Sequence, residues 1–250
     1  MASSKNKKNK VSEAMSNNFF RFKQFTVHQT DSAMKVGTDG VLLGAWHAID
    51  GHPARILDVG TGTGLIALML AQRFNDAQVT GVEIDGIAAA EAQRNVAASP
   101  FAGRIDIINA AFQDFQQQAQ TFDLIVSNPP YFCNALENPD TARATARHTS
   151  SLSFRNLLYG SMQLLDNNGR LAVILPTESL KAFLSEASII GLSLIKHTAV
   201  KTVERKEPSR HMLLLSKQYT GAPFEETVCL QNPDGTRSEW YQQQTQDFYL

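Results

Sequence analysis

Two short loops in the sequence combine residue types that could carry chemistry. The first is Asn128-Pro129-Pro130-Tyr131, which ends an apolar run over 122–127. Proline cannot donate a hydrogen bond to a sheet, so a strand ends here, and in an open α/β sheet ligands bind at the carboxyl ends of strands. Asn128 can donate and accept hydrogen bonds, and Tyr131 offers a flat face for stacking. The loop is suited to hold a planar group that carries an NH2, with an ordinary strand break as the alternative.

The second loop is Asp58-Val59-Gly60-Thr61-Gly62-Thr63-Gly64, between a buried strand at 55–59 and an apolar helix at 65–73. Glycines let the backbone approach a ligand, and the helix N-terminus adds a favourable dipole. The spacing differs from the Gly-x-Gly-x-x-Gly of dinucleotide sites. Asp58 suits an ammonium group better than a pyrophosphate, and Glu83 at the end of the next strand can accept from ribose hydroxyls. The predicted cofactor is S-adenosylmethionine, and a nicotinamide or other Rossmann cofactor is the alternative.

The elements around these loops alternate between strand and helix, which predicts an α/β fold with a parallel sheet and right-handed crossovers. We expect further strands at 78–84, 104–109, 122–127 and 170–175, and helices at 87–98, 154–165 and 178–190, with a stop at 166–169. Two later strands, 193–202 and 211–219, have no helix between them and form an antiparallel edge hairpin, which 227–230 can extend. Near the N-terminus, a short strand or a hairpin is expected over 19–28, and Thr38 or Asp39 can cap a helix over 41–47.

Composition limits the remaining possibilities. With 250 residues and 43% hydrophobic residues, the chain can bury one sizeable core. It has no run of 18 apolar residues, so no membrane span is expected, and the N-terminus lacks the apolar region of a secretory signal. Two cysteines, Cys133 and Cys229, cannot form a metal site by themselves. They indicate no disulfide framework, which fits a cytoplasmic protein. We expect a monomer.

Positive charge is concentrated at the N-terminus, although the formal net charge of the whole chain is −1. The first 23 residues contain Lys5, Lys7, Lys8, Lys10, Arg21 and Lys23 against the single acid Glu13. We expect residues 1–16 to be a disordered basic arm. Such an arm can bind nucleic acid through its phosphates or can be a solvated tail.

The glycine loop with its downstream Glu83 resembles the fingerprint of class I S-adenosylmethionine-dependent methyltransferases. That resemblance implies a Rossmann-like, seven-stranded, mostly parallel sheet with an antiparallel C-terminal hairpin. It also implies one methyltransferase domain over 17–250, with an N-terminal extension at 17–50 and the cofactor-binding and catalytic core at 51–250. Gly60, Gly62 and Gly64 would line the cofactor together with Asp58.

One position departs from the family pattern. Many class I enzymes place an acidic residue after the third strand to bind the cofactor adenine, but here that strand runs into Ala110-Ala111-Phe112. Two alternatives stay open. Either Asp114 reaches the adenine amino group, or backbone atoms around Ala111 and Phe112 do so while the Phe112 ring packs on the adenine.

The Asn128–Tyr131 loop is similar to the acceptor motif of methyltransferases that act on planar exocyclic nitrogens. Such a nitrogen is a poor nucleophile because its lone pair is delocalised. The Asn128 side-chain oxygen and the Pro129 carbonyl can hold its two hydrogens and favour a more tetrahedral nitrogen, while Tyr131 stacks on the ring. No general base is strictly required, and covalent catalysis by Cys133 is not needed. The motif alone leaves adenine N6, guanine N2 and glutamine N5 as acceptors.

Further segments resemble the bacterial tRNA(Val) adenine-N6 methyltransferase family over nearly the whole chain beyond the basic arm. They are Gly37-Thr38-Asp39-Gly40, Tyr131-Phe132-Cys133 and Ala146-Arg147-His148-Thr149. The family modifies the adenine 3′ of the anticodon of valine tRNA, and in it the segment with Lys35 and Thr38 lines the pocket. A glutamine-N5 methyltransferase of the release-factor type usually has a separate helical N-terminal domain. Here only about 50 residues, with a basic and aromatic character, precede the first sheet strand, which favours RNA over a protein substrate.

The resemblance implies an RNA surface beside the site, because a stacked adenine must be splayed out to react. We expect it to include Phe132, Arg143, Arg147, His148, Arg205 and Lys206, together with the basic arm and with Lys201 and Arg210 of the same hairpin loop. Arg205 and Lys206 lie between Glu204 and Glu207, so a solvated turn is an equal alternative there. A guanine-N2 methyltransferase of ribosomal RNA remains a second enzymatic alternative. A non-enzymatic RNA-binding module does not explain why Asp58, Glu83 and Asn128 occur together.

Overall fold

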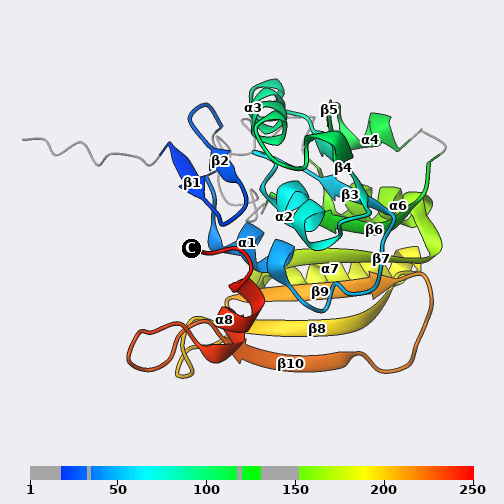
Figure 1. The fold of residues 1–250 in the computed structure, drawn as a ribbon. Helices are drawn as coiled ribbons and strands as arrows, with labels where there is room; N and C mark the ends of the chain where they lie inside the picture. The colour runs from blue at the N-terminus through cyan, green and yellow to red at the C-terminus, as the bar shows by residue number, and fades with distance from the viewer. Residues whose placement is uncertain (1–17, 33–34, 117–119, 131–151) are drawn as a thin grey trace, which may run out of the picture.

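The computed structural model describes residues 18–32, 35–116, 120–130 and 152–250 (Figure 1). The basic arm and the segment 131–151 lie outside these residues. Predictions for Tyr131, Phe132, Arg143, Arg147 and His148 therefore stay predictions.

The described strands form a small hairpin and one large sheet (Figure 1). The strands are β1 (Phe19–Arg21), β2 (Thr26–His28), β3 (Arg55–Val59), β4 (Gln78–Glu83), β5 (Ile105–Asn109), β6 (Phe122–Ser127), β7 (Leu165–Pro176), β8 (Ser193–Lys201), β9 (Arg210–Ser216) and β10 (Phe224–Cys229). The helices are α1 (Thr38–Ala45), α2 (Leu65–Arg73), α3 (Gly86–Ala97), α4 (Phe112–Phe115), α6 (Phe154–Leu164), α7 (Thr177–Ile190) and α8 (Glu239–Thr245), with a 3-10 turn, η1, at Ala102–Arg104.

The large sheet confirms the predicted fold class. Its order is β10-β8-β9-β7-β6-β3-β4-β5. Strand β9 is antiparallel to β7 and β8, and the other neighbouring pairs are parallel. The expected count of seven strands is one too low for the described chain, because β10 adds an eighth strand parallel to β8 at the edge. The chain order reverses between β3 and β6, and the loops that follow these two strands are the two loops singled out from the sequence.

Helices cover both faces of the sheet because successive strand side chains point to opposite faces. Ile56 and Leu124 pack with α1, α2 and α8 in one cluster, whereas Leu57 and Ile125 pack with α4, α6 and α7 in another. The predicted helix at 65–73 and strand at 122–127 have the observed bounds.

Two local predictions are wrong. Strand β7 already begins at Leu165 and runs through the expected stop at 166–169, with a register shift opposite Phe122. Gly169 permits this, since a Cβ there would lie 2.8 Å from the Phe122 carbonyl oxygen. Helix α1 has Gly37 at its N-cap without a side-chain cap, so neither Thr38 nor Asp39 caps it; the Asp39 carboxylate instead accepts a hydrogen bond from Arg210.

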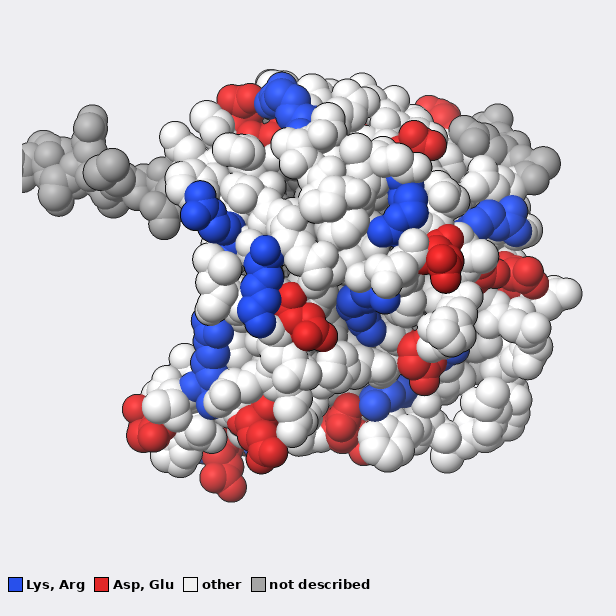
Figure 2. Space-filling model, viewed as in Figure 1, with Lys and Arg blue, Asp and Glu red and all other residues white. Residues whose placement is uncertain are grey.

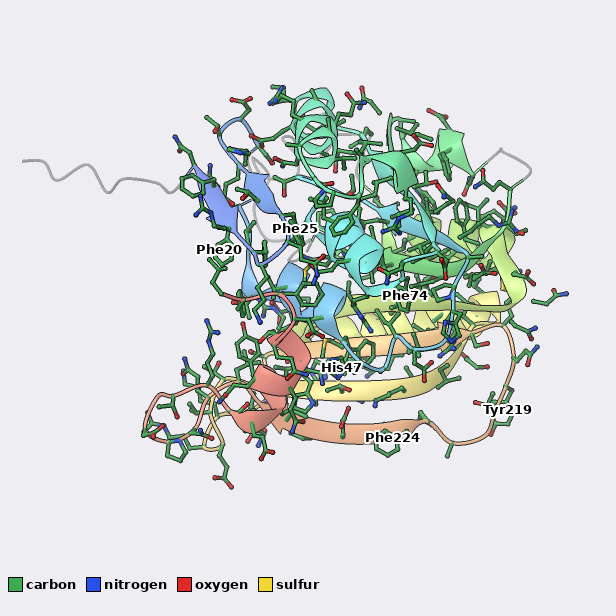
Figure 3. The ribbon with its side chains drawn as sticks, viewed as in Figure 1. Phe20, Phe25, His47, Phe74, Tyr219 and Phe224 are labelled. Atoms are coloured by element: carbon green, nitrogen blue, oxygen red, sulfur yellow. The ribbon has the colours of Figure 1, made fainter. Side chains whose placement is uncertain are left out.

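The N-terminal hairpin is docked on the C-terminal segment. Phe22 stacks on Phe25 and Tyr249, with ring centroids 4.7 and 6.0 Å apart, and the Lys23 backbone N–H donates to the Phe248 carbonyl. Figure 3 labels Phe20 and Phe25 in this region. The extension that leads into α1 is therefore held against the body by contacts between the two ends of the described chain.

The contact between α4 and α6 requires a glycine, which gives a first testable prediction. A Cβ on Gly160 would lie 2.4 Å from Cε1 of the buried Phe112 ring. We expect Gly160→Ala to destabilise the protein by about 1–3 kcal/mol through overpacking, measured by urea unfolding. Gly103→Ala is the matched control, because a Cβ at Gly103 has no neighbour within 4 Å. Equal stability of both variants would contradict this packing.

Candidate functional site

A cavity of about 560 Å³ lies where the glycine loop, the start of α1 and the base of the β8–β9 hairpin meet. Five residues predicted from the sequence are on its wall: Lys35, Thr38, Gly60, Gly62 and Asn128. They come from three separate parts of the chain, namely the N-terminal extension, the loop after β3 and the loop after β6. The structure therefore brings the predicted cofactor loop and the predicted acceptor loop to one cavity.

The glycine loop has a backbone that only glycine adopts readily. Gly60, Gly62 and Gly64 have φ values of 73°, 56° and 83°, in the left-handed region. The backbone N–H groups of Gly60 and Thr61 both donate to the Val82 carbonyl, which fixes the loop across the end of β4. An added Cβ at Gly60 or Gly62 would meet no atom of the described residues within 4 Å. The loop forms a cradle that a side chain would fill, which fits a bound cofactor.

Asp58 lies beneath this loop and is fully buried. Its Oδ2 accepts hydrogen bonds from Thr61 Oγ1 at 2.6 Å and from the Ala67 backbone N–H at 3.1 Å, so it ties the loop to α2. Its Oδ1 is buried without a hydrogen-bond partner among the described residues. An unpaired buried acceptor is costly, and a donor such as an ammonium group would satisfy it. Asp58 does not itself line the cavity, so its visible contacts hold the loop, and a contact with the cofactor stays a prediction.

Burial raises the pKa of Asp58 to about 7, against the hydrogen bonds from Thr61 and Ala67, which lower it. The folded protein therefore keeps a proton that the unfolded chain releases near pH 4. Because the raised pKa belongs to the folded state, the stability contribution is present at low pH and is lost as pH rises toward 7.

We expect Asp58→Asn to remove this dependence. Between about pH 4 and pH 7, the free energy of unfolding of the unmodified protein should fall relative to that of the variant by up to about 1.4 kcal/mol per pH unit. Urea unfolding of both proteins across this range, without ligand, measures the difference. Parallel pH profiles would show that Asp58 does not titrate there.

Glu83 connects the glycine loop to the turn after β4. Its Oε2 accepts from the Gly62 backbone N–H at 2.9 Å, and its Oε1 accepts from the Asp85 N–H at 2.9 Å. The half-buried carboxylate stands at the carboxyl end of β4, next to the loop it is predicted to serve. Its predicted role toward ribose hydroxyls remains a prediction.

The structure narrows the alternatives for the cofactor adenine. The Phe112 ring is 4% exposed and packs in the core, so a backbone contact is what stays predicted for that residue. The Ala111 carbonyl accepts from the N–H groups of Asp114 and Phe115, while the Asp114 residue is exposed. Asp114 and the backbone around Ala111 and Phe112 thus remain as candidates for the contact with the adenine amino group.

On the acceptor side, Asn128 follows β6 and is half-buried, and Pro129 is buried. Ser127 Oγ donates to the Val59 carbonyl at 2.8 Å, which ties the end of β6 to the end of β3. This bond fixes the distance between the glycine loop and Asn128.

The far wall of the cavity consists of Val200, Thr202, Ser209, Arg210, Leu230 and Gln231. Of these residues the sequence indicated only Arg210, as part of the RNA surface, and the others were missed. Arg210 Nε donates to Asp39 Oδ2 at 2.7 Å, so this wall contacts α1. Local sequence carries no signal for the pair, because its members are 171 positions apart. Arg205 and Lys206, predicted to bind RNA, lie exposed in the turn beyond the cavity. Figure 2 shows Lys and Arg side chains along the side of the molecule that carries β1, β2 and α8, with acidic side chains among and below them.

The described residues contain no group of three or more potential metal ligands. None of the helices in the described ranges has the length and apolar character needed to cross a membrane.

Comparisons with known proteins agree with this geometry. A family described as "Methyltransferase domain" matches residues 56–153. A tRNA1(Val) (adenine(37)-N6)-methyltransferase of Porphyromonas gingivalis is 44% identical over 94% of this chain and 96% of its own length. The protein of the same name from Aeromonas hydrophila is 45% identical over 94% of this chain and 98% of its own.

Solved structures share the fold at lower identity. A predicted O-methyltransferase from Agrobacterium tumefaciens superposes with a TM-score of 0.67 at 17% identity, over 85% of this chain and 98% of the other. TrmN from Thermus thermophilus gives 0.54 at 23% identity, over 71% of this chain and 49% of the other.

Proposed function

The chain belongs to the tRNA1(Val) (adenine(37)-N6)-methyltransferase family, and on that premise we propose that it methylates the exocyclic N6 of an adenine in valine tRNA, with S-adenosylmethionine as methyl donor. The target is the adenine 3′ of the anticodon, at the position that the names of its relatives give. The observation that carries the proposal is the single cavity shared by Gly60, Gly62 and Asn128.

The cofactor side of this cavity is suited to a cationic nucleoside. Among the residues that the structure describes, Asp58 Oδ1 has no hydrogen-bond partner below the loop, and no atom lies within 4 Å of a Cβ added at Gly60 or Gly62. Glu83 stands at the end of β4. When bound, S-adenosylmethionine supplies an electrophilic methyl group on a sulfonium. Asp58 and Glu83 would bind and orient the cofactor, and Lys35 and Thr38 would line the side toward the extension.

The acceptor side explains why an Asn and a Pro follow β6. The Asn128 side-chain oxygen and the Pro129 carbonyl would each accept one N–H of the target amine, which turns the nitrogen lone pair out of conjugation with the ring. This interaction strengthens as the nitrogen becomes tetrahedral, so it stabilises the transition state more than the ground state. The departing proton is acidic once the nitrogen is alkylated and needs no dedicated base. Tyr131 would stack on the adenine.

The family also decides between acceptors that the loop leaves open. An amide nitrogen of glutamine and the N2 of guanine fit the same pair of hydrogen-bond acceptors, but the relatives are named for adenine. Phe132, Arg143, Arg147, His148, Arg205 and Lys206 remain the proposed contacts to the anticodon stem-loop. We further propose that the protein acts as a monomer in the cytoplasm on this tRNA.

Labelled methyl transfer to a panel of acceptors tests the proposal. The purified protein should label an unmodified valine tRNA transcript, and an adenine-to-guanine change at the target should abolish labelling. Labelling of a release factor, or of ribosomal RNA in preference to the tRNA, would contradict the proposed substrate.

A further inference from the structure

The turn between β8 and β9, residues 202–209, borders the cavity through Thr202 and Ser209, and it has a mixed charge. Arg205 and Lys206 are exposed there beside Glu204 and Glu207, which are exposed as well. The formal charges cancel, so the turn has no general attraction for RNA. Only its orientation decides whether its cations or its anions meet a phosphate.

The turn is anchored from the face of the sheet that carries α1. Arg210, the first residue of β9, pairs with Asp39 in the first turn of α1 at 2.7 Å, and its Nη1 donates to the Ser209 carbonyl at 2.8 Å. Helix α1 is itself fixed by close packing on α2, since a Cβ on Gly44 would lie 2.7 Å from Met69 Sδ. The pair therefore ties the end of the turn to a fixed helix.

A second anchor lies on the opposite face of the sheet. It is a chain of hydrogen bonds in which each donor and acceptor can be assigned. Thr177 Oγ1 donates to the Pro208 carbonyl at 2.6 Å, so its contact of 3.0 Å with His211 Nε2 must be donated by the histidine. His211 Nδ1 then accepts from His197 Nε2 at 2.8 Å. Burial and the neighbouring His197 lower the pKa of His211, in agreement with a neutral ring that donates at one nitrogen and accepts at the other.

The neighbouring loop adds a third contact. The Gln231 backbone N–H donates to the Thr202 carbonyl at 2.9 Å, and Ser209 N–H donates to the Val200 carbonyl at 3.0 Å. Figure 1 shows the loop between β8 and β9 beside the loop between β10 and α8. The turn is thus fixed at its two ends and on both faces of the sheet.

From these contacts we infer that Asp39, Arg210 and Thr177 are positioning residues that hold the β8–β9 turn as a rigid lip of the acceptor cavity. The lip presents Arg205 and Lys206 to phosphates of the RNA strand that enters. This inference rests on the proposed function and adds the part of the chain that sets the register of the substrate.

A positioning role and a purely electrostatic role of Asp39 predict opposite changes in RNA affinity when Asp39 is replaced. Asp39→Ala removes a negative charge from the cavity, which by charge alone should tighten RNA binding. If Asp39 positions the turn, the same substitution should weaken binding of valine tRNA about 3- to 10-fold. It should also reduce the slope of log affinity against log salt by about 0.7 for each phosphate of a single strand that the turn no longer neutralises.

The experiment measures the affinity for unmodified valine tRNA over a salt series, with methyl transfer as a separate readout. Asp50→Ala is the matched control, because Asp50 pairs with Arg170 at 2.6 Å and does not line the cavity. Thr177→Val should reproduce the weaker binding without a change of charge, and Arg210→Lys should lose part of the affinity because lysine lacks the fork of donors. KM for S-adenosylmethionine should stay within about twofold in Thr177→Val, because Thr177 does not line the cavity.

Two further results decide the inference. In a variant with Arg205→Gln and Lys206→Gln, binding should be weaker and Asp39→Ala should have no additional effect, as expected for residues that act through the turn. Tighter or unchanged binding by Asp39→Ala, or unchanged binding after removal of both cations, would overturn the inference. A wild-type protein that does not methylate the tRNA would instead overturn the proposed function.

Discussion

Replacing Asn128 by Ala is expected to lower kcat for methyl transfer about 10²- to 10³-fold, the usual loss when a preorganised transition-state hydrogen bond is removed. Asn128 lines the same cavity as the glycine loop, and the Ser127–Val59 hydrogen bond holds the ends of β6 and β3 together. Because the side chain is assigned to the acceptor, affinity for S-adenosylhomocysteine should change less than about threefold. Single-turnover kinetics together with calorimetric binding separate the two quantities.

The matched control for this substitution is Asn168→Ala. Asn168 is an exposed asparagine outside the cavity, and its side chain accepts a hydrogen bond from Gln218. The kcat of the Asn168→Ala variant should equal that of the unmodified protein. If Asn128→Ala lost cofactor affinity in proportion to activity, Asn128 would belong to the cofactor site.

Replacing Glu83 by Ala is expected to raise the Kd for S-adenosylhomocysteine about 10- to 100-fold. Hydrogen bonds to a charged group contribute about 1.5–3 kcal/mol, and each 1.4 kcal/mol corresponds to a factor of ten. Part of the loss comes from the Gly62 N–H, which donates to this carboxylate in the absence of ligand. Isothermal calorimetry measures the change, with Glu186→Ala on α7 as the control for removing one carboxylate elsewhere.

A cofactor analogue without ribose hydroxyls separates these two contributions. The unmodified protein should bind the analogue more weakly than the complete compound, whereas Glu83→Ala should bind both with similar affinity. If the variant still discriminated between them as strongly as the unmodified protein, the ribose contact would have to be assigned to another residue.

Much of the fold could be predicted because its signals are local. The apolar run from Leu65 to Arg73 and the strand from Phe122 to Ser127 have their expected bounds, and the alternation of strands and helices predicts a parallel sheet. The start of strand β7 could not be predicted from the sequence, since 166–169 has the composition of a turn. Only the neighbouring β6 makes a strand favourable there, because Gly169 lets the two backbones come together.

In the candidate site, too, only the parts with a local sequence signal could be predicted. Glycines at 60, 62 and 64 and the Asn-Pro-Pro-Tyr segment could be recognised because residue type and spacing carry their chemistry. The cavity wall with Ser209 and Gln231 could not be predicted, since it depends on how β8, β9 and β10 pair and on where α1 lies. Arg210 could be predicted as an RNA contact but not as part of this wall. The sequence indicated Thr38 or Asp39 as a helix cap, whereas in the structure Asp39 forms an ion pair with Arg210.

The most direct test of the central claim is the identity of the methylated atom. Valine tRNA is incubated with the protein and S-adenosylmethionine carrying a deuterated methyl group, digested to nucleosides and analysed by mass spectrometry. The expected product is deuterated N6-methyladenosine from a single site 3′ of the anticodon, and none is expected with Asn128→Ala. Label in a guanine nucleoside, at a ring nitrogen of adenine or on ribose would contradict it.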